Sequence, residues 1–147
     1  MVEYGRPWIT YDAIKWLDCF LNQTMRAFEW GSGGSTIFIS QRVKHLISIE
    51  HDKKWYQLVL QSIEKNKFFN CEYLLVEPEQ ITPGQWDFFF DNFSNSQNYV
   101  SNIPELSLLN FERYVKKSNC FQIILILCLL MVEQEIFAYY MQLIRCA

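Results

Sequence analysis

The sequence of 147 residues has no block of basic residues, and its formal net charge is −3. Nothing in it therefore predicts a nucleic-acid groove or a polybasic membrane contact. An apolar run at 123–132 has only ten residues, whereas a membrane span needs about 20. Residues 1–6 lack the apolar centre of a signal peptide. We expect a cytoplasmic protein that contacts neither membrane nor nucleic acid.

Several catalytic and structural patterns are also missing. With two histidines, His45 and His51, a histidine-based metal cluster is not expected. The five cysteines include no Cys-x-x-Cys pair, and their odd number fits free thiols in a reducing compartment. No Gly-x-Ser-x-Gly elbow is present, and no lysine follows the glycines as in a phosphate-binding P-loop. We expect no metal site, disulfide framework or serine-hydrolase triad.

What is present is a regular alternation of helices and strands in a chain that is half hydrophobic and long enough for one domain. Apolar spacing and turn residues predict strands at Met25–Glu29, Leu46–Glu50 and Cys71–Val76. Helices are expected after Thr10, from Ser35 or Thr36 to about Arg42, and after Asp52, with Thr10 and Asp52 as N-caps. The helix after Asp52 is expected to be closed by Asn70 and to bury Trp55, Leu58, Val59 and Ile63. Such alternation favours an α/β fold, a Rossmann-like parallel sheet with helices on both faces.

The most informative segment is the glycine-rich turn 31–34. Gly31 and Gly33 permit a tight turn whose N–H groups approach a ligand closely, and the N-terminus of the next helix favours a carboxylate or phosphate there. Glu29, beside the turn, disfavours a diphosphate and suits a ligand end that carries both amine and carboxylate. Glu50 ends the second strand, 21 residues later, and offers two oxygens to a pair of ribose hydroxyls. A ligand with an amino acid at one end and a ribonucleoside at the other is S-adenosylmethionine.

These residues resemble the first two motifs of class I S-adenosylmethionine-dependent methyltransferases. The stretch from Trp8 to Pro78 looks like a bacterial subgroup with Glu-x-Gly-Ser-Gly-Gly-Ser-Thr and Ser-Ile-Glu-His-Asp, and it covers about half of the chain. The resemblance implies that residues 1–78 form the cofactor-binding half, in which Glu29 and the glycine turn hold the methionine part, Glu50 the ribose, and His51 lies along the adenine. The candidate cofactor-binding residues are Glu29, Gly31, Ser32, Gly33, Gly34, Ser35, Glu50 and His51.

Each of these residues also has a purely structural interpretation. The glycines can form only a strand-to-helix turn, Glu50 can be a solvated strand end, and His51 a surface or capping residue. Trp30 and Trp55 are expected in the core rather than against a cofactor.

The second half of the chain is less regular. Residues 79–107 are expected to form an insertion or loop, followed by a helix at Phe111–Lys117 within a segment, 108–147, that ends in an atypical tail. Trp86–Asn92 has the composition of a fourth strand, but Pro78–Gln85 is too short for a parallel crossover.

The tail from Gln122 has no glycine, no proline and no turn signal. The resemblance places a fourth strand and an Asp-Gly-Arg turn here. When the codons that can encode Leu130–Ile136 are read in the frame that starts at the third base of each codon, they can encode Asp-Gly-Arg-Ala-Arg-Asn. We hypothesise that the chain leaves the ancestral reading frame between about Ser118 and Phe121. The alternative is an ordinary strand within Ile123–Leu130 followed by a helix at Glu133–Leu143.

The sequence thus predicts a methyltransferase whose acceptor is a small or sugar-like molecule. It identifies no catalytic base and no oligomeric state. One alternative is a truncated, inactive remnant that binds the cofactor weakly or not at all. The other is a nicotinamide-dependent oxidoreductase, which Glu29 and the absence of Gly-x-Gly-x-x-Gly disfavour.

Overall fold

The computed structural model describes residues 5–81, 99, 106, 108–117 and 125–127, the last three as backbone only. The chain divides into two compact units, Met1–Leu75 with Gln122–Ala147 and Val76–Phe121. In the described part of the second unit, β4 (Glu79–Gln80) pairs antiparallel with β5 (Leu109–Asn110), and α5 covers Glu112–Lys116. The helix expected at Phe111–Lys117 is therefore confirmed.

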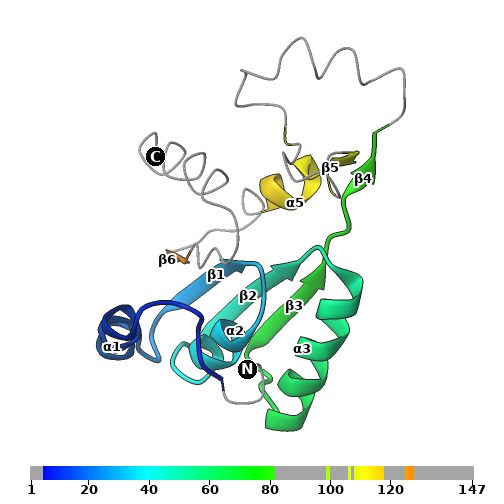
Figure 1. The fold of residues 1–147 in the computed structure, drawn as a ribbon. Helices are drawn as coiled ribbons and strands as arrows, with labels where there is room; N and C mark the ends of the chain where they lie inside the picture. Colours follow the sequence, from blue (N-terminus) through cyan, green and yellow to red (C-terminus); the bar gives the residue numbers. More distant parts are fainter. Residues whose placement is uncertain (1–4, 82–98, 100–105, 107, 118–124, 128–147) are drawn as a thin grey trace. The chain divides into compact units, whose positions relative to one another are not determined.

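The first unit is built on a parallel sheet, as the alternation predicts (Figure 1). Its strand order is β3-β2-β1-β6. The strands are β1 (Arg26–Trp30), β2 (His45–Glu50), β3 (Cys71–Leu75) and β6 (Leu125–Leu127), and the helices are α1 (Tyr11–Phe20), α2 (Gly34–Ser40) and α3 (Lys53–Asn66). The α/β, Rossmann-like class is confirmed.

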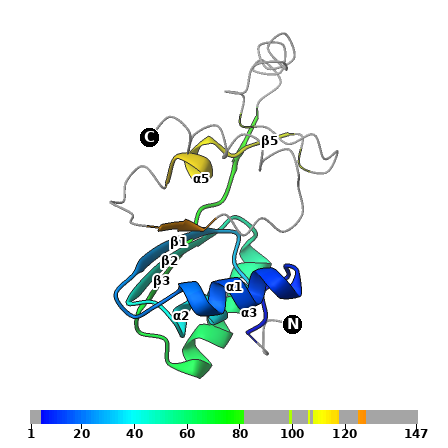
Figure 2. The same ribbon diagram turned by 90° about the vertical axis from the view of Figure 1, so that its left-hand side faces the viewer.

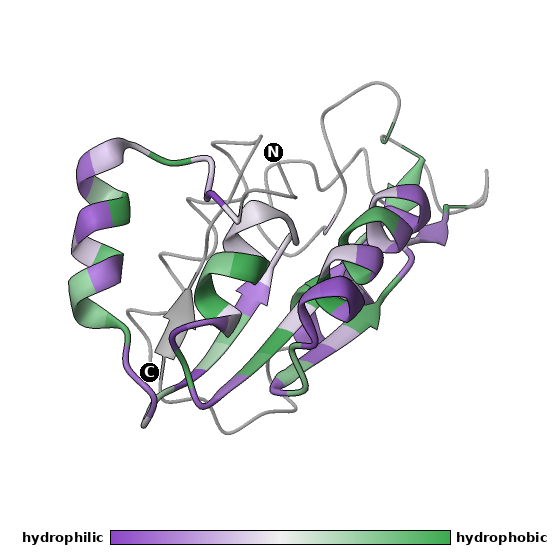
Figure 3. Ribbon diagram, turned by 90° about the horizontal axis from the view of Figure 1, so that it is seen from below, coloured by the Kyte–Doolittle hydropathy of each residue, from purple (hydrophilic) through white to green (hydrophobic). Residues whose placement is uncertain are grey.

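The three helices of this unit lie on one face of the sheet (Figures 2 and 3). The chain steps from β1 to β2 to β3 in one direction, and right-handed crossovers in one direction place their helices on the same face. The opposite face carries other buried side chains, which alternate with those that face the helices: Phe28, Trp30, Ile47 and Ile49. Both faces of the neighbouring strands β1 and β2 are thus buried, as is typical of parallel sheets.

Local signals in the sequence account for the starts of α1 and α3, whereas α2 begins at Gly34, before the predicted Ser35 or Thr36. Oγ1 of Thr10 accepts the N–H of Ala13 at 3.4 Å, and Oδ1 of Asp52 accepts the N–H groups of Lys54 and Trp55 at 2.7 and 2.9 Å. Both caps satisfy donors that the first helical turn leaves unpaired. The predicted N-caps are confirmed.

The predicted end of α3 was wrong. The helix ends at Asn66, and Lys67 follows in the left-handed region with φ 56°. The side chain of Asn70 instead donates to the carbonyl oxygens of Ser40 and Val43, at 2.8 and 2.9 Å. Asn70 therefore joins the α3–β3 connection to the end of α2. An amide that bonds two carbonyls distant in sequence leaves no local pattern.

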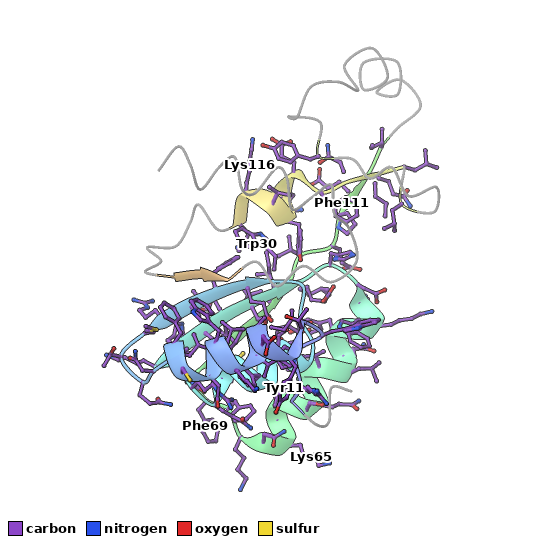
Figure 4. The ribbon with its side chains drawn as sticks, turned by 60° about the vertical axis from the view of Figure 1, so that its left-hand side comes forward. Tyr11, Trp30, Lys65, Phe69, Phe111 and Lys116 are labelled. Carbon is purple, nitrogen blue, oxygen red and sulfur yellow. The ribbon has the colours of Figure 1, made fainter. Side chains whose placement is uncertain are left out.

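The predicted buried face of α3 was partly wrong. Val59 and Ile63 are buried as expected, but Trp55 and Leu58 are 38% and 53% exposed. The surface exposes other large side chains too, including Tyr11 of α1 and Phe69 (Figure 4). Trp55 lies in the first turn of α3, where its indole N–H donates to a backbone carbonyl oxygen rather than entering the core.

The described residues leave several predictions about the second half untested. Trp86–Asn92 and Glu133–Leu143 lie outside them. Within Ile123–Leu130, β6 runs parallel to β1, with Leu125 opposite Ala27. Among the residues that the structure describes, no helix is long and apolar enough to cross a bilayer.

The two glycines that precede α2 and begin it give a matched test of this packing. A Cβ on Gly34 would lie 2.1 Å from the carbonyl oxygen of Arg6, whereas a Cβ on Gly33 would meet nothing nearer than Trp55 at 3.9 Å. We expect Gly34→Ala to lower the free energy of unfolding by about 1–3 kcal/mol. Urea denaturation measures it.

The control is Gly33→Ala, whose φ of 167° is ordinary extended backbone. Its effect on stability is expected to be clearly smaller. Equal losses in the two variants would contradict the packing of Arg6 against α2.

Candidate functional site at the carboxyl edge

The candidate residues gather where β1, β2 and β3 end, which we call the carboxyl edge. Glu29 is the penultimate residue of β1, and Glu50 is the last residue of β2. The chain order reverses at β1, which has β2 on one side and β6 on the other. In open parallel sheets, ligands bind outside the carboxyl ends of the strands at such a switch point. The fold thus brings both acids to the position where such ligands bind.

Glu29 is completely buried between β1, β2 and α2. Its Oε2 accepts the hydroxyls of Thr36 and Ser48, at 2.7 and 2.8 Å. Its Oε1 has no hydrogen-bond partner of good geometry among the described residues. A buried polar atom without a partner is costly, so this oxygen is an acceptor that a bound cation would satisfy.

Burial raises the pKa of Glu29 from 4.5 to about 7. The hydroxyls of Ser35, Thr36 and Ser48 oppose this rise, and the nearby charge of Glu50 adds to it. A carboxyl group with this pKa is present in both protonation states near neutrality. A cation bound beside it would favour the charged form.

Glu50 is also buried, and its carboxylate joins two turns. Oε2 accepts the N–H and the hydroxyl of Ser32, at 3.0 and 2.8 Å. Oε1 accepts the N–H groups of His51 and Asp52, at 2.8 and 3.0 Å. Four hydrogen bonds use about all of the acceptor positions of a carboxylate. The interpretation of Glu50 as a solvated strand end is therefore wrong.

The N–H groups of Gly31, Ser32 and Gly33 in the glycine turn are bonded within the protein. That of Gly31 donates to the carbonyl oxygen of Ile49 at 3.0 Å, and that of Gly33 to Oγ1 of Thr36 at 2.9 Å. Gly31 has φ 72°, the left-handed region that favours glycine. Together with the N–H of Ser32, which donates to Glu50, these bonds attach the turn to β2 and α2.

The remaining predicted residues lie nearby in different settings. Ser35 is buried beside Glu29, so it belongs to the polar cluster beneath the turn. Gly34 lies against the backbone of Arg6, which explains its missing side chain without a ligand. His51 is partly exposed, with Nδ1 3.2 Å from Oε1 of Glu50.

Three further residues at this edge were missed by sequence reasoning. The indole N–H of Trp55 donates to the carbonyl oxygen of Ser32 at 2.7 Å, so its assignment to the core was wrong, whereas Trp30 is buried as predicted. The hydroxyl oxygen of Tyr73 lies 2.5 Å from Oγ of Ser32. Ser48 bonds Glu29, and its place between apolar neighbours in β2 was the one available signal.

The donor set suits an organic ligand better than a metal. Among the described residues, no group of three His, Cys, Asp or Glu side chains could hold a metal ion. The features present are an unpartnered buried acceptor on Glu29 and a carboxylate on Glu50 that already accepts one hydroxyl. Chemically, the acceptor on Glu29 suits an amine, and the carboxylate of Glu50 suits ribose hydroxyls.

The buried carboxyl group of Glu29 predicts a pH-dependent stability. Its pKa is about 7 in the folded chain and 4.5 when unperturbed, so the folded state binds the proton more tightly. Its contribution to stability is fully present below pH 4.5 and is lost as the pH rises to 7, by about 3 kcal/mol in total. We expect Glu29→Gln to remove this loss, as measured by urea denaturation between pH 4.5 and 7.5.

The control for this experiment is Glu72→Gln, which changes a largely exposed glutamate of β3. Its stability should fall with pH in parallel with the unsubstituted chain. A parallel fall in Glu29→Gln as well would show that Glu29 titrates normally in the folded state.

No protein-family profile matches the chain, and no curated protein matches it at a significant level. Solved structures that it resembles include a dimethyladenosine transferase from Plasmodium falciparum (TM-score 0.40, 13% identity over 53% of this chain), a protein-L-isoaspartate O-methyltransferase (0.33, 18%, 44%) and the 23S rRNA methyltransferase ErmE (0.39, 14%, 53%). The chain spans 30%, 21% and 34% of their respective lengths.

Proposed function

We propose that the carboxyl edge binds S-adenosylmethionine and that the chain is a methyltransferase, or the cofactor-binding part of one, acting on a small or sugar-like acceptor. The single observation that carries the proposal is the meeting of two buried acids, Glu29 and Glu50, around a glycine turn at a topological switch point. The resemblance of the sequence to the first two methyltransferase motifs supports it.

In this proposal the two acids act on opposite ends of the ligand. Oε1 of Glu29 has no partner of good geometry among the described residues, and it would accept the ammonium group of the methionine part. Glu50 would exchange the Ser32 hydroxyl for a ribose hydroxyl. The partly exposed side chains of His51 and Trp55 would border the adenine.

The chemical demands on the protein are modest. When bound, S-adenosylmethionine supplies an activated methyl group, so the chain has chiefly to orient the acceptor and exclude water. Glu29 is buried and Glu50 is fully bonded, so both position a ligand and neither is suited to take a proton from an acceptor. These contacts do not identify the residues that would bind the methyl acceptor.

A second candidate, from a different class, is a protein that binds the nucleoside without catalysis. The hydrogen bonds of the glycine turn favour it, because the N–H groups of Gly31, Ser32 and Gly33 already donate to acceptors of the protein and are not free for the carboxylate of a methionine part. Such a protein would bind S-adenosylhomocysteine and transfer no methyl group to any acceptor. An NAD-dependent oxidoreductase is disfavoured, because Glu29 would lie next to the diphosphate.

The experiment that tests the proposal measures S-adenosylhomocysteine binding by titration calorimetry. We expect the unsubstituted chain to bind and Glu50→Ala to bind at least tenfold more weakly, roughly the loss of one or two charged hydrogen bonds. NAD should give no heat of binding.

The matched control is Glu72→Ala on the neighbouring strand, whose carboxylate pairs with His45 away from the carboxyl edge. Its affinity should equal that of the unsubstituted chain. Thermal melts establish that each variant is folded. An unchanged affinity in folded Glu50→Ala would remove Glu50 from the site.

A further inference from the structure

Ser32 is attached to three different elements at the carboxyl edge. Its N–H and hydroxyl donate to Oε2 of Glu50 on β2, its carbonyl oxygen accepts the indole N–H of Trp55 on α3, and its Oγ lies 2.5 Å from the hydroxyl oxygen of Tyr73 on β3. A residue required only to form the turn would not need these side-chain partners. Its hydroxyl bonds therefore call for a separate explanation.

The direction of these hydrogen bonds follows from the chemistry of the partners. A carboxylate only accepts, so the proton of the Ser32 hydroxyl points to Glu50. Oγ of Ser32 is then the acceptor of the Tyr73 hydroxyl. Burial raises the pKa of Tyr73 above its ordinary value, so the phenol keeps the proton that it donates. Tyr73 is itself fixed by stacking on Tyr56, with ring centroids 4.4 Å apart.

Ser32 presents two hydrogen-bond donors to Glu50, an N–H and a hydroxyl, and a ribose presents the same number. The donors of Ser32 lie 3.0 and 2.8 Å from one carboxylate oxygen, and those of a ribose are two adjacent hydroxyls. The other oxygen is bonded to the N–H groups of the β2–α3 turn. A ribose can reach the carboxylate only where Ser32 now donates.

We propose that Ser32 is an internal competitor for the ribose at Glu50, and that Tyr73 holds it in the competing position. The inference rests on the proposed function and concerns the regulation of the same site. A nucleoside then binds only to the fraction of molecules in which the Ser32 hydroxyl has left Glu50. The apparent affinity is lowered by that fraction.

The inference predicts opposite effects of one substitution on stability and on affinity. Ser32→Ala removes the hydroxyl bonds to Glu50 and Tyr73, so its melting temperature should fall. The same change frees an acceptor position on Glu50, and S-adenosylhomocysteine should bind about tenfold more tightly, the equivalent of one hydrogen bond to a charged group. Tyr73→Phe leaves Ser32 bonded to Glu50 but unsupported, and a smaller gain in affinity is expected.

Ser62→Ala is the matched control. The Ser62 hydroxyl lies within α3 and donates to the carbonyl oxygen of Leu58 at 3.5 Å, a bond inside the helix. Calorimetric titrations and thermal melts are run on all four proteins, and Ser62→Ala should match the unsubstituted chain in affinity.

The outcomes separate the inference from the function on which it rests. Tighter binding by Ser32→Ala with a lower melting temperature supports it. If the unsubstituted chain binds and Ser32→Ala binds equally or more weakly, the competitor role is wrong and the proposed function stands. If no variant binds S-adenosylhomocysteine, both are overturned.

Discussion

The carboxylate of Glu50 is the interaction on which the carboxyl edge depends. Through four hydrogen bonds it fixes the glycine turn on one side and the β2–α3 turn on the other. Both turns lie near Glu50 because they follow β1 and β2, parallel strands that end at the same edge of the sheet. Glu50 is therefore a structural residue, and in the proposed function a ribose would compete with Ser32 for one of its oxygens.

At Glu29, beneath the same turn, hydrogen bonds and burial have opposite effects on the charged carboxylate. Two hydroxyls satisfy one of its oxygens, while burial opposes its charge. An apolar residue here would avoid the cost of burying an acid. A buried acid with a raised pKa at a candidate site is a common sign of function. A cation bound beside the oxygen of Glu29 that has no hydrogen-bond partner of good geometry would offset the cost of burying the acid.

The sequence predicted the parts of the fold that depend on local signals. Thr10 and Asp52 predicted the starts of α1 and α3, and the alternation of helices and strands predicted the parallel sheet. What could not be predicted depends on contacts between distant residues. Asn70 bonds the end of α2 and Trp55 extends over the glycine turn, and neither interaction leaves a periodic pattern. At the site, the residue types and their meeting at one edge were predictable, but the bonding of Ser32 to Glu50 and Tyr73 was not.

The most direct test of the account is a titration of the isotope-labelled chain with S-adenosylhomocysteine, followed by backbone amide NMR. Both turns that Glu50 joins should respond when a ribose takes an oxygen from Ser32. We expect the largest shift changes at Gly31, Ser32, Gly33, His51 and Asp52, and no change in α1. Absence of shifts at saturating ligand, or shifts confined to α1, would contradict the placement of the ligand at the carboxyl edge.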